Sequence, residues 1–188
     1  EGAPILKPET EKAPRLDGKG QLCRSVKALL LLRKRIQKRK MIRVGIIGCG
    51  KIADQHADQI QRISTSKIVG VCDKEELMAK QLAERFGVGH SFSDVNKFLE
   101  VTKPHVVHIT TPPQSHFMLA HACLDAGCSV YVEKPFTVNT AEAENLIRVA
   151  QEKNLKITAG HNAQFSPTAL RMRELIRSGF LGGPPVHM

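Results

Sequence analysis

The sequence lacks the features that mark a membrane-spanning protein, a disulfide framework or a zinc site. Its longest aliphatic run, residues 28–32 (ALLLL), is far shorter than the ~20 residues that a bilayer span needs. The five cysteines are odd in number and include no Cys-x-x-Cys pair, and the eight histidines show no His-Glu-x-x-His spacing. We therefore expect no membrane partner, no metal and reduced thiols in the cytoplasm.

Aromatic residues are also scarce, with no tryptophan and one tyrosine, and the net charge of +10 is concentrated at one end. Residues 1–40 hold 12 Lys and Arg against 4 Asp and Glu, whereas residues 41–188 hold 16 against 14. Residues 1–20 are expected to be linker-like, and residues 21–40 could form a basic amphipathic helix. A contact of that helix with a membrane surface, RNA or a partner stays open. Because no aromatic residue interleaves with the charges and the apolar stripe is narrow, we favour the tail of a preceding domain or an extension ahead of a start at Met41, and no nucleic-acid partner.

From Met41 onward, short apolar runs alternate with amphipathic segments. Strands are expected at residues 42–47, 68–72, 88–91, 105–110, 129–132 and 155–159. Helices are expected at residues 51–62, 75–86, 115–126 and 140–153, the last capped by Asn139 or Thr140, and also from a Ser93 cap to residue 101 and from a Ser166 cap to residue 178. Strands linked by helices predict an α/β fold with a doubly wound parallel sheet of the Rossmann type over residues 41–162.

A glycine loop joins the first expected strand to the first expected helix. Gly48, Gly50 and Ala53 form a G-x-G-x-x-A pattern. The intervening cofactor-binding candidates are Cys49, Lys51 and Ile52. Gly48 allows a tight turn, and Gly50 lets the backbone approach a pyrophosphate at the helix N-terminus. Asp73 follows 25 residues after Gly48, where its carboxylate suits the ribose hydroxyls of NAD and repels the 2′-phosphate of NADP, although neighbouring Lys74 keeps NADP open.

A second motif lies at residues 127–135, which read GCSVYVEKP. Together with the glycine loop, Asp73 and a Thr-Thr-Pro-Pro segment, it resembles the Gfo/Idh/MocA family of NAD(P)-dependent oxidoreductases over residues 42–188. The resemblance implies that Lys134 is the catalytic residue, contacting substrate and nicotinamide ribose, and that Pro135 stiffens its turn, where a cis peptide bond is compatible with the sequence. His116 is expected to order a loop rather than do chemistry, and Glu133 is expected to orient Lys134 or to bind backbone. The further cofactor-binding positions that the resemblance implies are Thr110, Thr111, Pro112, His116, Glu133 and Lys134 itself.

The resemblance implies the nucleotide-binding half of an oxidoreductase that moves a hydride between a sugar, inositol or related polyol and NAD, or NADP. It also implies that residues 163–188 begin a truncated second α/β domain, so that this chain alone binds NAD without turnover. The full-length protein is expected to be a homo-oligomer. Two alternatives stay open: an NAD-dependent glycoside hydrolase of the same fold, and a non-catalytic module that senses NAD.

Overall fold

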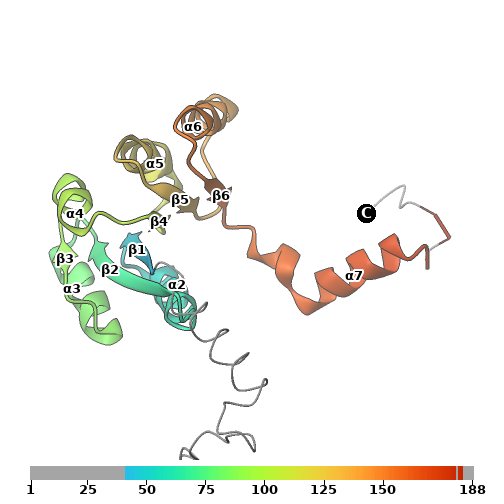
Figure 1. Ribbon diagram of the computed structural model, residues 1–188, viewed down its shortest axis with the longest axis horizontal. Coiled ribbons are helices and arrows are strands. Elements are labelled where there is room, and N and C mark those ends of the chain that lie inside the picture. The colour runs from blue at the N-terminus through green and yellow to red at the C-terminus, as the bar shows by residue number, and fades with distance from the viewer. Residues whose placement is uncertain (1–40, 181, 184–188) are drawn as a thin grey trace, which may run out of the picture. The chain divides into compact units, whose positions relative to one another are not determined.

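Six parallel strands form one sheet in the computed structural model, which describes residues 41–180, 182 and 183. The strands are β1 (Ile42–Ile47), β2 (Ser66–Cys72), β3 (Ser91–Phe92), β4 (Val106–Ile109), β5 (Ser129–Val132) and β6 (Ile157–Ala159). Their order across the sheet is β3-β2-β1-β4-β5-β6 (Figure 1), which is the doubly wound order of the Rossmann fold. The predicted fold class is therefore confirmed, while the expectations for residues 1–40 concern a segment outside the described residues.

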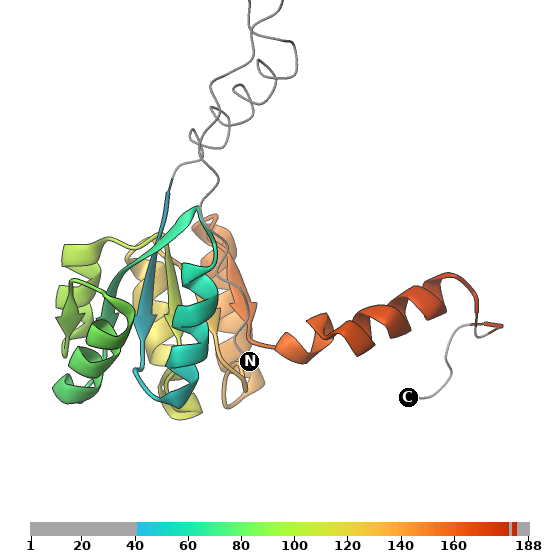
Figure 2. The same cartoon turned by 90° about the horizontal axis from the view of Figure 1, so that it is seen from below.

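Helices cover both faces of this sheet. Those that do so are α2 (Lys51–Gln61), α3 (Glu76–Phe86), α4 (Val95–Thr102), α5 (His116–Asp125) and α6 (Thr140–Glu152). The chain also has α7 (Pro167–Arg177) and short 3-10 turns η1 (Pro113–Ser115) and η2 (Asn162–Phe165). Helices α2 and α3 pack on one face, and α4, α5 and α6 pack on the other (Figure 1). Figure 2 views the sheet from the side that carries α2 and α3. None of the described helices is both long and apolar enough to cross a bilayer.

Two apolar cores hold these layers together. On the α2 face, the small buried residues Ala53 and Ala57 let α2 approach the sheet closely, and Leu82 of α3 completes the core. On the opposite face, Phe98 of α4 and Leu124 of α5 are fully buried against the central strands. Because successive residues of a strand point to opposite faces, β1 supplies both cores: Val44 and Ile46 face α2, whereas Ile47 faces the other core together with Val107 and Ile109 of β4.

The third strand lies later than the sequence indicates. We expected it at residues 88–91, but β3 contains only Ser91 and Phe92, which pair with the end of β2 at the edge of the sheet. Val88 is buried for another reason. It follows Gly87, whose φ of 62° ends α3 in the left-handed conformation, and the Val88 N–H donates to the Ala83 carbonyl. The apolar residue thus completes a helix C-cap and not a strand.

The helix caps are mostly as the sequence predicts. The Asn139 side chain accepts a hydrogen bond from the Glu142 N–H at the start of α6, and the Ser166 side chain caps α7 in the same way. The expectation for α4 was wrong by one residue, because Asp94 rather than Ser93 accepts the Lys97 N–H. Helix α7 has no buried residue.

Candidate functional site

The glycine loop between β1 and α2 rests directly on the end of β4. Gly48 has a φ of 95°, and a Cβ at this position would lie 2.7 Å from Thr111 Cγ2. The Thr110 hydroxyl is buried and donates to the Gly48 carbonyl at 2.6 Å. Both the backbone conformation and the close approach of β4 therefore require glycine at position 48.

Gly50 stands in open space at the other end of the loop. Its backbone is extended, with a φ of −78°, and a Cβ there would meet no atom within 4 Å. Gly50 is the N-cap of α2, and this helix start has no hydrogen bond from a capping side chain. Such a terminus directs its N–H groups and the positive end of the helix dipole at an anion. The loop therefore fits the pyrophosphate of a dinucleotide.

Asp73 joins this loop to the end of β2. Its Oδ2 accepts a hydrogen bond from the Cys49 N–H at 2.6 Å, and its Oδ1 accepts one from the Glu75 N–H at 3.0 Å. The sequence suggested only a ribose-binding role for this carboxylate, so its second role as an anchor for the glycine loop was missed. Burial, followed by the charge of Asp73, raises the pKa of the Cys49 thiol to about 12. Cys72 is raised to a pKa of about 12 by the same two causes, so both cysteines are protonated packing residues.

A cavity of about 520 Å³ opens at the carboxyl ends of β1, β2 and β4. The predicted cofactor residues that line it are Gly48, Gly50, Asp73, Thr110, Thr111 and Pro112. A larger cavity of about 790 Å³ lies at the opposite edge of the sheet, around Arg43 and Lys103. Because ligands of open α/β sheets bind at the carboxyl ends of the strands, the smaller cavity is the candidate site.

The remaining predicted residues lie around this cavity rather than in its wall. Cys49 is buried behind the loop, and Lys51 is exposed in the first turn of α2. Ile52 and Glu133 line a separate cavity of about 400 Å³ on the α2 side of the sheet. Lys134 is exposed in the turn that follows β5, and the peptide bond between it and Pro135 is cis.

His116 lies between the loop that contains Thr111 and the turn that contains Lys134 and Pro135. Its ring is fully buried, with Nε2 2.8 Å from the Thr111 carbonyl and Nδ1 2.9 Å from the Pro135 carbonyl. The first carbonyl belongs to the loop after β4, and the second belongs to the Lys134 turn. This position suits the loop-ordering role that we expected for His116. Within the described range, no three His, Cys, Asp or Glu side chains gather as metal ligands would.

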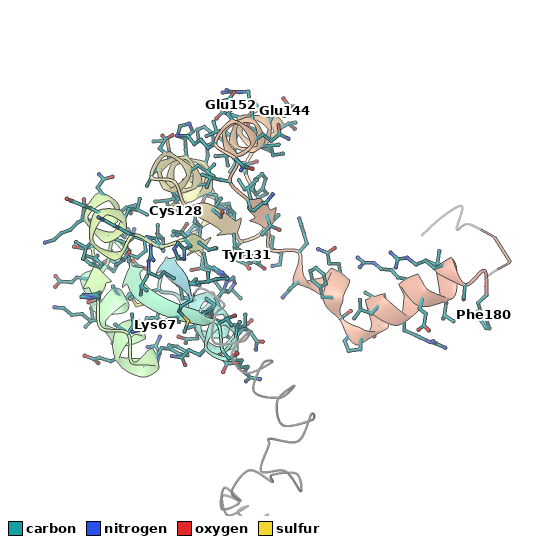
Figure 3. All side chains as sticks on the ribbon, viewed as in Figure 1. Lys67, Cys128, Tyr131, Glu144, Glu152 and Phe180 are labelled. Carbon is teal, nitrogen blue, oxygen red and sulfur yellow. The ribbon has the colours of Figure 1, made fainter. Side chains whose placement is uncertain are left out.

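A cluster of polar rings that was not expected from the sequence lies on the α2 side of the sheet. The Nδ1 atoms of His56 and His108 are 2.9 Å apart, and His56 Nε2 is 3.0 Å from Glu133 Oε1. The ring of Tyr131 stacks on His108 with centroids 4.8 Å apart, and Figure 3 shows Tyr131 on the side of β5 away from α5 and α6. Two patterns could have indicated the cluster: His56 shares a helix face with Ile52 and Ile60, and strand alternation separates His108 from its apolar neighbours.

Comparisons with known proteins place this geometry in a family. A family model described as an oxidoreductase family with an NAD-binding Rossmann fold, Gfo/Idh/MocA, matches residues 42–161. Oxidoreductase P35 of Formosa agariphila is 31% identical over 139 residues, which cover 73% of this chain and 43% of that protein. UDP-N-acetylglucosamine 3-dehydrogenase of Acidithiobacillus ferrooxidans is 33% identical over 133 residues, or 71% of this chain and 41% of that enzyme.

A solved structure agrees with these sequence matches. Scyllo-inositol dehydrogenase from Lactobacillus casei, crystallised with bound NAD(H) and scyllo-inositol, superposes with a TM-score of 0.71 at 25% identity. The match covers 76% of this chain and 43% of that enzyme. The chain thus spans about two fifths of the length of the relatives that it matches.

Proposed function

Because the chain belongs to the Gfo/Idh/MocA oxidoreductase family, we propose that it forms the cofactor-binding half of an NAD-dependent dehydrogenase acting on a sugar, inositol or related polyol. The substrate class is supported by the names of its relatives, which include a UDP-N-acetylglucosamine 3-dehydrogenase and a scyllo-inositol dehydrogenase. Residues 41–162 are the cofactor domain in this proposal, and residues 163–188 begin a second domain.

The observation that carries the proposal is the cavity at the carboxyl edge of the sheet. It combines an uncapped helix start beside Gly50 with the Asp73 carboxylate, and these two features suit the pyrophosphate and the adenosine ribose of one dinucleotide. A carboxylate in this position repels a 2′-phosphate, which supports NAD over NADP as the preferred cofactor.

Lys134 is the residue to which we assign the chemistry. When bound, the nicotinamide supplies the hydride acceptor, and this chain must supply the charge beside the reacting hydroxyl. An ammonium at Lys134 would stabilise the negative charge that develops on the substrate oxygen. The position of the Lys134 turn supports this role, because the turn lies at the carboxyl end of β5. The His116 ring also contacts both this turn and the Thr111 loop that lines the cavity.

Two further parts of the proposal concern the cell and the assembly. We propose a cytoplasmic protein because the four described cysteines, Cys49, Cys72, Cys123 and Cys128, are all free and buried. We also propose, on the family resemblance alone, that the full-length protein is a homo-oligomer.

Calorimetric titration of the 188-residue chain tests the cofactor assignment. We expect NAD to bind weakly but measurably, NADP to bind less tightly, and Asp73→Ala to weaken NAD binding. Asp58→Ala, which removes an exposed carboxylate on α2, is the matched control and should change nothing. An absence of binding heat at millimolar NAD would refute the proposal. Sugar-dependent NADH formation by this chain alone would show that the substrate site needs no second domain.

A further inference from the structure

A chain of hydrogen bonds runs from the α2 face of the sheet to the Lys134 turn. It starts at His108 on β4, passes through His56 on α2, and reaches Glu133 just after β5. The second oxygen of Glu133, Oε2, accepts the backbone N–H of Lys134 at 3.3 Å. The two histidines are 52 residues apart, and His56 and Glu133 are 77 residues apart, so only the tertiary fold brings these groups together.

The protonation of the two histidines is constrained by their surroundings. Burial, together with the nearby His56, lowers the pKa of His108 to about 3, so the His108 ring is neutral at ordinary pH. The Glu133 carboxylate accepts from His56 Nε2–H, which leaves Nδ1 of a neutral His56 as an acceptor for His108 Nδ1–H. Stacking on Tyr131 keeps the His108 ring in the plane that this hydrogen bond requires. His56 is therefore held at both of its nitrogens.

Glu133 is restrained by three neighbours: the His56 ring, the Lys134 N–H and the backbone of Gly160. Side chains of His56 and Glu133 are only 10% and 13% exposed, so solvent does not replace their contact. Gly160, which follows β6, packs against the same carboxylate, because a Cβ at this position would lie 2.7 Å from Glu133 Oε1. One oxygen is fixed by His56, and the other faces the Lys134 N–H.

We propose that His56 is a positioning residue for Lys134, acting through Glu133. The inference rests on the proposed function, in which Lys134 contacts the nicotinamide ribose. The Lys134 turn is then held at two points: Glu133 fixes its first N–H from the α2 face, and His116 binds the Pro135 carbonyl from the other side. The cofactor cavity itself contains neither histidine, so the turn is oriented by groups outside the cavity wall.

Two substitutions at His56 separate its two contacts. His56→Gln keeps a nitrogen that can reach Glu133 and loses the ring contact to His108. His56→Asn keeps a polar atom near His108 but is too short to reach Glu133. We expect hydrogen exchange of the Lys134 amide, measured by NMR, to accelerate about fivefold in His56→Asn and less than twofold in His56→Gln, since a typical hydrogen bond is worth about 0.5–1.5 kcal/mol. Gln55→Ala, an exposed neighbour on α2, is the control.

Ligand binding then tests whether the positioning reaches the cofactor. His56→Asn should raise the Kd for NAD about threefold to tenfold and leave the Kd for ADP, which lacks the nicotinamide riboside, within twofold of the unsubstituted protein. Equal losses for NAD and ADP, or an unchanged NAD affinity, would overturn the positioning role. Exchange at Lys134 that is the same in both variants would also overturn it. If the unsubstituted protein bound no NAD, the proposed function would fail, while the exchange measurement would still decide whether His56 fixes the turn.

Discussion

The Cys49 N–H donates to Oδ2 of Asp73 across 2.6 Å, so one carboxylate joins the glycine loop to the end of β2. Its other oxygen is held by the Glu75 N–H. A ribose hydroxyl that enters the cavity would meet a carboxylate whose direction is already fixed. Such preorganisation reduces the conformational entropy that binding would otherwise lose, so under the proposed function we expect Asp73 to matter both for the fold of the loop and for the affinity for a nucleotide.

Substitutions at Asp73 should separate these two roles. Asp73→Ala removes both hydrogen bonds and the charge, and we expect it to lower the free energy of unfolding by about 1–3 kcal/mol and NAD affinity about tenfold. Asp73→Asn keeps an oxygen for the Cys49 N–H but turns its amide NH2 towards the Glu75 N–H, so it should recover part of the stability but not the NAD affinity. It should also narrow the preference for NAD over NADP, because the repulsion of a 2′-phosphate is gone. Urea unfolding and calorimetry measure the two effects, and equal behaviour of the two variants would contradict the anchoring role.

The two glycines of the loop should respond differently to the same change. Gly48→Ala places a Cβ 2.7 Å from Thr111 Cγ2 at a φ of 95°, and we expect a loss of about 1–3 kcal/mol of stability from the strained backbone. Gly50→Ala meets no protein atom within 4 Å, so the fold should be unaffected. Its methyl group would instead occupy the space that we assign to the pyrophosphate, and NAD affinity should fall at least tenfold, by an amount comparable to a lost charged hydrogen bond of about 1.5–3 kcal/mol. Thermal unfolding and NAD titration of both variants distinguish these outcomes.

Removing His116 should loosen both loops at once. His116→Ala removes the ring that lies between the Thr111 and Pro135 carbonyls, one of which accepts the N–H of a neutral imidazole, and opens a space in a fully buried position. We expect a loss of about 2–4 kcal/mol in the free energy of unfolding, since each unsatisfied buried group costs about 1–3 kcal/mol. NAD affinity should fall as well, because Thr111 lines the cavity. The exposed His161, replaced by alanine, serves as the control. Full stability of His116→Ala would show that the two carbonyls find other partners.

Much of the fold could be predicted because its signals are local. The apolar runs of β1 and β5 and the side-chain caps Asn139 and Ser166 each depend on residues within one turn or one strand. The third strand could not be placed, since two residues at a sheet edge carry little pattern. The buried apolar residue Val88 also resembled part of a strand in the sequence, but its burial comes from its position in the C-cap of α3.

The parts of the candidate site that follow from local sequence could also be predicted, and the contacts between distant segments could not. The glycine loop is contiguous in sequence, and the residues lining the cavity follow directly after strands that meet at one edge. The link between His56, His108 and Glu133 was not predictable, because it depends on how α2 packs on β1 and β2 and turns His56 towards β4 and the end of β5. Strand alternation places His108 and Tyr131 on one face, and His56 lies on the buried face of its helix, but no local pattern pairs that helix face with these two strands.

The burial of His108 should make the protein sensitive to acid. The folded state lowers the pKa of His108 from 6.5 to about 3, first through burial and then through the nearby His56. Between pH 6.5 and pH 3, His108 is therefore protonated in the unfolded chain but not in the folded chain. The stability that a neutral His108 contributes is fully present above pH 6.5 and is lost progressively as the pH falls towards 3.

His108→Gln removes this titration and keeps a polar side chain opposite His56. Between pH 7 and pH 4.5, we expect the free energy of unfolding to fall by about 1–3 kcal/mol more in the unsubstituted protein than in His108→Gln, since one pKa unit corresponds to about 1.4 kcal/mol. Urea unfolding at both pH values measures the difference. The control is His161→Gln, because His161 is exposed and its substitution also removes one imidazole. It should leave the pH dependence of unfolding unchanged. If His108→Gln and the unsubstituted protein lost stability in parallel, His108 would take up its proton in the folded state, and its ring could not be the neutral partner that holds His56.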